Sequence, residues 1–482
     1  MNIPRRKPLC ARIGLLGVGH ETYWHQFPGL LDELKAKVVR LSEKLTALGA
    51  EVETFGMSDN ALTAAALVPR LNAANLDLIV IDVTTYATSA SVGRLFSQVH
   101  VPIILAALQP VPAMDYGNTS THKMLWTDDI CCVPELMGVA VRMGRTIPDV
   151  VVGMLENDPI ADANLKQWVA IARALHDLKS ARIGHLGHVL ESMLDMHTDP
   201  TALSNAFGVH VVQCEPEDIE RWYSEQYATE IEAKKRDILD FFDTPTPIND
   251  PITAKLTEPD LHIAAKAAVA LEKFIEEKKI DGLAYYYEGT AGTTLQEVIT
   301  NLIVGNSLLT AAGFPMCGEF DIKTCIAMLI FDRLDIGGSF AEFHPLDFNR
   351  NMILVGHDGP HHLNIADKKP MLRSLAKFHG KPGHGASVEF NIKKGPITML
   401  SIGVRPDGQF RFVVAEGDSV DGPALGLGNT ITYGYFGDDL RAFLKSWFKA
   451  GPTHHFALGI GHHADTVEKL AACLGIECIT VK

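Results

Sequence analysis

The run RIGLLGV at residues 12–18 is the first indication of the fold class, because this short apolar segment is typical of a buried strand and a helical pattern follows it. From Phe27 to Leu48, apolar residues recur at helical spacing with charges on the other face. The alternation then continues with expected strands at Glu51 to Phe55, Leu78 to Val83 and Val101 to Leu108, and expected helices at Ala61 to Leu71 and Ala90 to Val99. Strands that alternate with helices predict a parallel, doubly wound sheet.

The opening motif returns as RIGHLG at residues 182–187, and the alternation restarts after it. We expect a helix near Thr201 to Phe207, a strand at His210 to Cys214, long helices through Asp243 and Lys278, a strand at Gly282 to Tyr287 and a helix at Thr294 to Ala312. Two successive α/β domains with a related plan are the economical interpretation. A repeat of only six residues can also arise by chance, or because both segments form a similar turn after a strand.

Short β-rich segments separated by turn signals follow from about Phe340. They are Met352 to Val355, Ala386 to Ile392, Ile397 to Val404 and Phe410 to Ala415, before a last helix at Ala464 to Leu474 and a last strand at Glu477 to Val481. This pattern predicts an antiparallel sandwich or barrel. We therefore expect an α/β protein with domains at residues 1–178, 179–335 and 336–482.

Composition narrows the functional classes. The formal charge of −15 disfavours nucleic acid as a partner, because a phosphate backbone is bound mainly by clustered Lys and Arg. The one compact basic run, Arg5 to Lys7, is expected to be a solvated tail. No apolar run approaches the roughly 20 residues that cross a bilayer, and Met1 to Cys10 lack the apolar core of a secretory signal. With no CxxC pair among eight cysteines, we expect reduced thiols and a cytoplasmic protein.

The glycines after the first strand do not predict a dinucleotide site, because their spacing is GxxGxG rather than GxGxxG. Polar and aromatic residues follow them and suit either contact with a sugar or packing within their own domain: His20, Glu21, Tyr23, Trp24 and Gln26. In the run Tyr285 to Glu288, which includes Tyr287, alternation along a strand lets about half of the side chains face a central cleft.

Four residues in the last third of the chain resemble one divalent-metal site: Glu319, Glu342, His357 and one of the pair His454 and His455. Two carboxylates and two imidazoles suit an octahedral, Mn²⁺-like ion. We expect both glutamates on loops at one end of the sheet, where α/β proteins bind ligands. If His454 and His455 lie on a strand, their rings point to opposite sides and only one can bind the ion. Twenty histidines also make chance clusters easy, and the doublets at 361–362 and 462–463 show this.

These contexts, in this order, resemble the L-arabinose isomerase and L-fucose isomerase superfamily, and the arabinose branch most. The segment 318–324 (GEFDIKT) matches the family's Gly-Glu-x-Asp-x-Lys-Thr, and 339–342 (SFAE) matches its Ser-Phe-x-Glu. A Gly-His turn at 356–357 and the second histidine of a doublet, His455, complete the ligand set. Upstream, residues 118–122 (NTSTH) resemble the segment whose histidine approaches the substrate, which is His122 here.

The resemblance implies two Rossmann-like domains followed by a β-rich domain, Mn²⁺ as the ion with Mg²⁺ or Co²⁺ as substitutes, and homotrimers or homohexamers with sites between subunits. Two departures predict a sugar pocket unlike that for L-arabinose. Residues 343–347 read FHPLD where the family has Asp-Tyr-Thr-Tyr-His, and Thr119 replaces a glutamine.

The sequence thus predicts a metal-dependent enzyme that interconverts an aldose and a ketose through an enediolate. Glu319 and Glu342 would be catalytic, and the sugar would be contacted by His122, His20, Tyr23, His454 and Tyr287. Two alternatives stay open: a metal-dependent sugar epimerase on the same scaffold and a non-catalytic sugar-binding or sensor protein.

Overall fold

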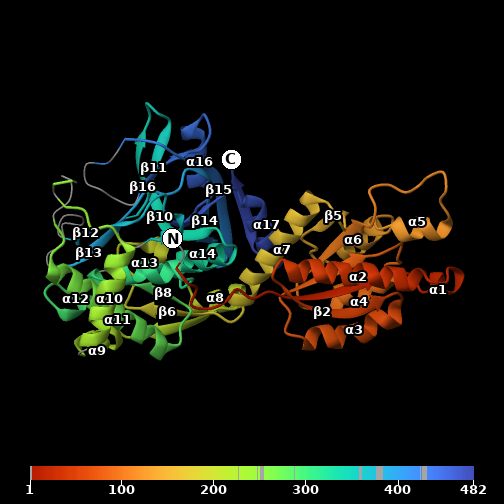
Figure 1. Cartoon of the computed structure of the whole chain (residues 1–482), viewed down its shortest axis with the longest axis horizontal. Coiled ribbons are helices and arrows are strands. Elements are labelled where there is room, and N and C mark those ends of the chain that lie inside the picture. Colours follow the sequence, from red (N-terminus) through yellow and green to blue (C-terminus); the bar gives the residue numbers. More distant parts are fainter. Residues whose placement is uncertain are drawn as a thin grey trace. The chain divides into compact units, whose positions relative to one another are not determined.

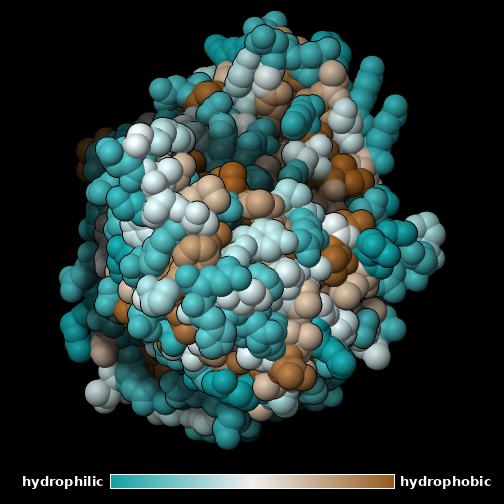
Figure 2. Space-filling view, turned by 90° about the vertical axis from the view of Figure 1, so that its right-hand side faces the viewer, coloured by the Kyte–Doolittle hydropathy of each residue, from teal (hydrophilic) through white to brown (hydrophobic). Residues whose placement is uncertain are grey.

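The computed structural model describes residues 3–225, 227–246, 248–249, 255–286, 288–357, 361–375, 384–423, 425 and 431–482. Packing divides the chain into two compact units. Unit 1 comprises Met1–Pro8, Leu178–Ala471 and Ile476–Lys482, and unit 2 comprises Leu9–Asp177 and Ala472–Gly475. Among the described residues, no helix is long and apolar enough to span a membrane. Hydrophilic residues dominate the face drawn in Figure 2, with hydrophobic residues scattered among them.

Unit 2 is built around a five-stranded, fully parallel sheet in the order β2-β1-β3-β4-β5, coloured red to orange in Figure 1. Its strands are β1 (Arg12–Val18), β2 (Glu51–Ser58), β3 (Leu78–Val83), β4 (Ile103–Gln109) and β5 (Val150–Met154). Its helices are α1 (Thr22–Gln26), α2 (Leu30–Ala47), α3 (Ala61–Ala73), α4 (Ala90–Gln98), α5 (Thr121–Thr127), α6 (Val133–Arg142) and α7 (Pro159–Leu178). The predicted parallel sheet is confirmed, and β1 and β3 have the predicted bounds.

A second parallel sheet, in unit 1, has the order β7-β6-β8-β9. It contains β6 (Arg182–Leu186), β7 (His210–Cys214), β8 (Gly282–Tyr285) and β9 (Met316–Cys317). The helical segments are η1 (Leu194–Met196), α8 (Pro200–Phe207), α9 (Pro216–Ser224), α10 (Ala228–Phe241), α11 (Glu258–Lys278), α12 (Thr294–Thr300), α13 (Ile303–Ala311) and α14 (Ile322–Arg333). The single helix expected from Thr294 to Ala312 is thus two helices, interrupted at Asn301 and Leu302.

The β-rich part of unit 1 is a barrel rather than a sandwich. The strands follow the order β14-β17-β10-β11-β16-β15, and pairing of β15 with β14 closes the ring. Its elements are β10 (Gly337–Asp347), β11 (Met352–Gly356), β14 (Gly395–Val404), β15 (Phe410–Val420), β16 (Ile431–Tyr435) and β17 (His455–Ile460), with β18 (Glu477–Val481) added beside β15. A separate hairpin and the remaining helices are β12 (Met371–Ser374), β13 (Ala386–Glu389), η2 (Leu363–Ile365), α16 (Leu440–Lys449) and α17 (Ala464–Leu474).

Helix α14 joins the second sheet to the barrel, and all twelve of its residues are buried. It packs on β10, β14 and β17 of the barrel and on β8 of the sheet (Figure 1). Gly338 makes this contact close, because a Cβ atom there would lie 2.7 Å from the carbonyl oxygen of Met328. The residues just before α14 are therefore held against the strands that carry the other candidate ligands.

The basic segment near the N-terminus is not the solvated tail that the sequence predicts. Arg5 pairs with Asp332, which is almost fully buried, and the amide of Arg6 donates to the carbonyl oxygen of Ala312 at 2.9 Å. Lys7 forms an ion pair with Asp281. Buried carboxylates need a counter-charge, and this segment supplies one to α14.

Candidate metal centre

The four predicted ligands lie together in unit 1. Nε2 of His357 is 3.5 Å from Oε1 of Glu319 and 4.0 Å from Oε1 of Glu342, and Nε2 of His455 is 3.3 Å from Oε2 of Glu319. Potential ligand atoms of Glu342, His357 and His455 all lie within 4.8 Å of one another. The structure thus brings together side chains from four separate segments.

The register of the barrel explains three of these positions. On β10, Glu342 is paired with Gly356 of β11 on one side and with His455 of β17 on the other. His357 directly follows β11, so the three side chains belong to neighbouring backbone positions. The expectation that Glu342 lies on a loop is wrong. It lies within β10, since this strand runs on without a break from Gly337 to Asp347.

Glu319 lies in a tight turn between β9 and α14. Glu319 and Phe320 both have positive φ, 58° and 61°, a conformation that costs energy for residues with a side chain. The turn is held by the amide of Phe320, which donates to the carbonyl oxygen of Tyr285 at 2.9 Å, and by the ring of His185, stacked on that of Phe320 with 3.4 Å between centroids. Such strain persists only where surrounding contacts enforce it, and here it aims Glu319 at the cluster.

A carboxylate fixes the orientation of His455. Its Nδ1 donates to Oδ2 of Asp321 at 3.2 Å, and Asp321 in turn accepts hydrogen bonds from the amide and hydroxyl of Thr324 at the start of α14. A histidine that donates from one ring nitrogen to a carboxylate presents the other nitrogen to a metal. Nε2 of His455 therefore faces Glu319.

A chain of hydrogen bonds holds the backbone at His357. Nε2 of His361 donates to the carbonyl oxygen of His357 at 2.5 Å, and Nδ1 of His361 lies 3.1 Å from Oγ of Ser339. Ser339 belongs to β10, three residues before Glu342. These bonds connect the turn after β11 to the strand that carries the second glutamate.

His454 also reaches the cluster, contrary to the expectation that the two neighbouring rings point to opposite sides. Nε2 of His454 lies 3.5 Å from Oε2 of Glu319. The residue precedes β17, so strand alternation does not apply to it. Its Nδ1 donates to Oδ2 of Asp195 at 2.7 Å. Burial lowers the pKa of His454, but the carboxylates of Glu319 and Asp195 outweigh this effect and raise the pKa to about 9.

The donor set fits a divalent cation. Burial raises the pKa of Glu319, but His357, His454 and His455 outweigh it and hold the pKa well below its usual range. Oε2 of Glu319 and Nε2 of His455 are buried without a hydrogen-bond partner among the described residues. Ligands about 2.1 Å from an octahedral centre lie about 3 Å apart, close to the 3.3–4.0 Å separations here.

Sequence reasoning missed three residues beside the cluster. Asp321 belongs to the same sequence motif as Glu319, so the motif could have identified it. His344 lies two residues after Glu342 on the same face of β10, with its Nε2 3.8 Å from Oε1 of Glu342. Asp195 had no sequence signal, because it is 259 residues from His454.

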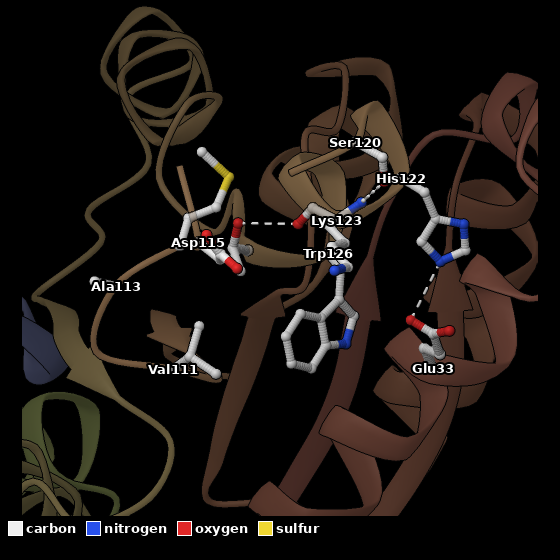
Figure 3. Close-up of a pocket in the computed structure, with 10 residues that line it drawn as sticks. Glu33, Val111, Ala113, Asp115, Ser120, His122, Lys123 and Trp126 are labelled. Carbon is white, nitrogen blue, oxygen red and sulfur yellow. Dashed lines mark hydrogen bonds and ion pairs between the residues drawn. The ribbon is translucent and has the colours of Figure 1, made fainter. Parts of the chain in front are cut away.

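The other predicted contact residues lie in unit 2, apart from Tyr287, which is outside the described residues. The ring of His20 meets that of Tyr23 edge-on, with 5.0 Å between centroids. His122 lies on α5, with Nε2 3.3 Å from Oε2 of Glu33 (Figure 3). It lines a pocket of about 660 Å³ together with Glu33, Val111, Ala113, Met114, Asp115, Ser120, Lys123, Trp126 and Thr127.

Comparison with known proteins finds similarity to sugar isomerases. Residues 337–477 match the L-arabinose isomerase C-terminal domain family, and this stretch carries Glu342, His357 and His455. The L-arabinose isomerase of Tolumonas auensis is 24% identical over 355 residues, which cover 72% of this chain and 68% of that protein. The sulfoquinovose isomerase of Clostridium sp. (strain MSTE9) is 23% identical over 418 residues, covering 83% and 85%. These matches support the arabinose and fucose isomerase superfamily as the family of this chain, in a divergent branch.

Proposed function

We propose that the protein is a metal-dependent isomerase that interconverts an aldose and a ketose. The observation that carries this proposal is the convergence of Glu319, Glu342, His357 and His455, two of whose buried polar atoms have no other hydrogen-bond partner in the described part of the chain. The similarity to sugar isomerases supports the reaction class.

The same four side chains would hold the ion, Mn²⁺ by preference, with Mg²⁺ or Co²⁺ as substitutes. When bound, the ion supplies Lewis-acid stabilisation of negative charge on the sugar oxygens. Asp321 and His361 keep His455 and the backbone of His357 in place, so the ligand geometry exists before the substrate arrives.

Glu319 and Glu342 have different surroundings, which suits different chemical roles for the two carboxylates. The side chain of Glu319 is 14% exposed and faces three imidazoles, whereas that of Glu342 is 29% exposed and faces His344 and His357. One carboxylate would move the proton between C1 and C2 of the open sugar, and the other would serve the oxygens. Proton transfer of this kind contributes at least about 10²-fold to the rate.

Glu319→Gln and Glu342→Gln variants test this assignment. We expect a loss of at least about 10²-fold in exchange of the C2 proton with D₂O. The substrate panel should contain pentoses, hexoses and tetroses, with L-arabinose and sulfoquinovose among them, and metal analysis should accompany it. Glu191→Gln, on an exposed loop, is the control. Near-native turnover in both test variants contradicts the proposal, and inversion at a carbon without aldose–ketose exchange indicates an epimerase.

We further propose a homotrimer or homohexamer in which His122 serves the site of a neighbouring copy. Three large apolar side chains near His122 in the sequence are exposed in unit 2: Tyr116, Met124 and Ile130. Light scattering should give three or six copies, and His122→Asn should lower kcat/KM for the sugar. A monomer with full activity contradicts this arrangement. We also propose that His20, Tyr23, His454 and Tyr287 contact the sugar and that the protein is cytoplasmic.

A further inference from the structure

Asp195 holds His454 at two points. Its Oδ2 accepts a hydrogen bond from the backbone amide of His454 at 3.1 Å and another from the ring Nδ1 at 2.7 Å. One carboxylate oxygen therefore sets both the position of the residue and the rotation of its ring. Because Nδ1 donates to Asp195, the opposite ring nitrogen, Nε2, is directed toward Oε2 of Glu319 at 3.5 Å.

The segment that carries Asp195 is itself anchored. Nζ of Lys323 donates to the carbonyl oxygens of Asp195 and Met196 at 3.0 and 3.1 Å, and the Lys323 side chain has no exposed surface. A buried ammonium needs such partners, so this short segment, η1, is tied to the first turn of α14. The same turn carries Asp321, which orients His455.

His454 and His455 are each held by a hydrogen bond to a carboxylate, but they differ in solvent exposure. Each donates from Nδ1 to a carboxylate, and each places Nε2 beside Oε2 of Glu319, at 3.5 Å for His454 and 3.3 Å for His455. The side chain of His455 is fully buried, whereas that of His454 is 37% exposed. Only His454 is therefore open to a molecule that enters from outside.

We propose that Asp195 is a positioning residue of this site, which fixes His454 so that its Nε2 forms a hydrogen bond with a sugar hydroxyl beside Glu319. This inference rests on the proposed function. It assigns His454 to the substrate rather than to the metal, and it adds the loop after β6 to the site. The substrate class is a polyhydroxylated sugar with a hydroxyl within reach of both Glu319 and His454.

The inference can be tested in the Mn²⁺-loaded protein with two variants, Asp195→Ala and Asp195→Asn. Glu191→Ala, on the same loop, is the control. We expect Asp195→Ala to lower kcat/KM by about 10- to 100-fold, as losses of outer hydrogen-bond partners do. Asp195→Asn, whose amide oxygen can still accept both bonds, should recover most of the loss, and Glu191→Ala should change nothing. The proposal places His454 against the sugar and not against the ion, so Mn²⁺ affinity, measured by calorimetry, should stay within about twofold in all three variants.

Nitrogen NMR of the His454 ring supplies a readout that needs no turnover. The wild-type ring should show a protonated, hydrogen-bonded Nδ1, and Asp195→Ala should change the chemical shift of that nitrogen. Unchanged kcat/KM in Asp195→Ala overturns the positioning role, and a loss of Mn²⁺ affinity in that variant overturns the assignment of His454 to the substrate. If the wild type isomerises no sugar, the proposed function fails, yet the ring measurement still tests the hold of Asp195 on His454.

Discussion

Nδ1 of His455 donates to Oδ2 of Asp321 at 3.2 Å, and both side chains are fully buried. Asp321→Asn removes the negative charge that holds this ring but keeps an oxygen able to cap α14. We therefore expect a stable protein with about 10- to 100-fold weaker Mn²⁺ binding, measured by calorimetry. Asp367→Asn, an exposed substitution, is the control. Equal affinities in the two variants would show that Asp321 does not tune the site.

Binding of the ion should stabilise the fold, because only the folded chain brings the four ligands together. At a free Mn²⁺ concentration 100 times Kd, the free energy of unfolding should rise by about 2.7 kcal/mol over the chelator-treated protein. Urea unfolding with and without the ion measures the difference. Glu319→Gln should lose most of this gain, and a variant that keeps it would exclude Glu319 as a ligand.

Gly338→Ala should destabilise the junction between β10 and α14. Its Cβ would lie 2.7 Å from the carbonyl oxygen of Met328 and 3.1 Å from Cβ of Phe331. Gly395→Ala is a matched control, because Gly395 has almost the same φ (113° against 112°) and no atom within 4 Å of a Cβ. Both variants carry backbone strain of about 1–3 kcal/mol, and Gly338→Ala should lose about 1–3 kcal/mol more from overpacking. Equal urea midpoints for the two variants would mean that α14 shifts to accommodate the added methyl group without a loss of stability.

In unit 2, two buried carboxyls share the ammonium of Lys37, which pairs with Asp129. Burial raises the pKa of Asp82 to about 6 and that of Asp129 to about 7, against the opposing charge of Lys37. A carboxyl with a raised pKa binds a proton more tightly when folded, so its contribution to stability is complete below about pH 4 and is lost as the pH rises through 6 to 7.

Asp82→Asn tests this pH dependence, since the amide copies the shape of the neutral acid. The free energy of unfolding of the wild type should fall relative to that of the variant between about pH 4 and 7. Urea unfolding at several pH values measures the difference. If the free energy of unfolding depends on pH in the same way in both proteins, Asp82 does not titrate in this pH range.

Much of the α/β part could be predicted from sequence. Strands β1 and β3 are continuous apolar runs bounded by turns, so local pattern alone gives their ends. The interruption at Asn301 was not predictable, because Asn301 is buried and its amide nitrogen donates to the carbonyl oxygen of His384 from another segment. The barrel closes because β14 pairs with both β15 and β17. The alternation of apolar residues along a strand does not reveal which strands pair.

For the site, the short motifs named Glu319, Glu342 and His357, because each stands in a local context that is unusual for a core, and the family resemblance selected His455 from its doublet. The way in which the ligands are held depends on contacts between distant segments, which the sequence does not reveal. Glu342 meets His455 through the register of β10 and β17, and His454 turns toward Glu319 because Asp195, distant in sequence, accepts its hydrogen bonds. Side-chain type and local period are properties of neighbouring residues, whereas ring orientation depends on which atoms the complete fold brings within about 3 Å.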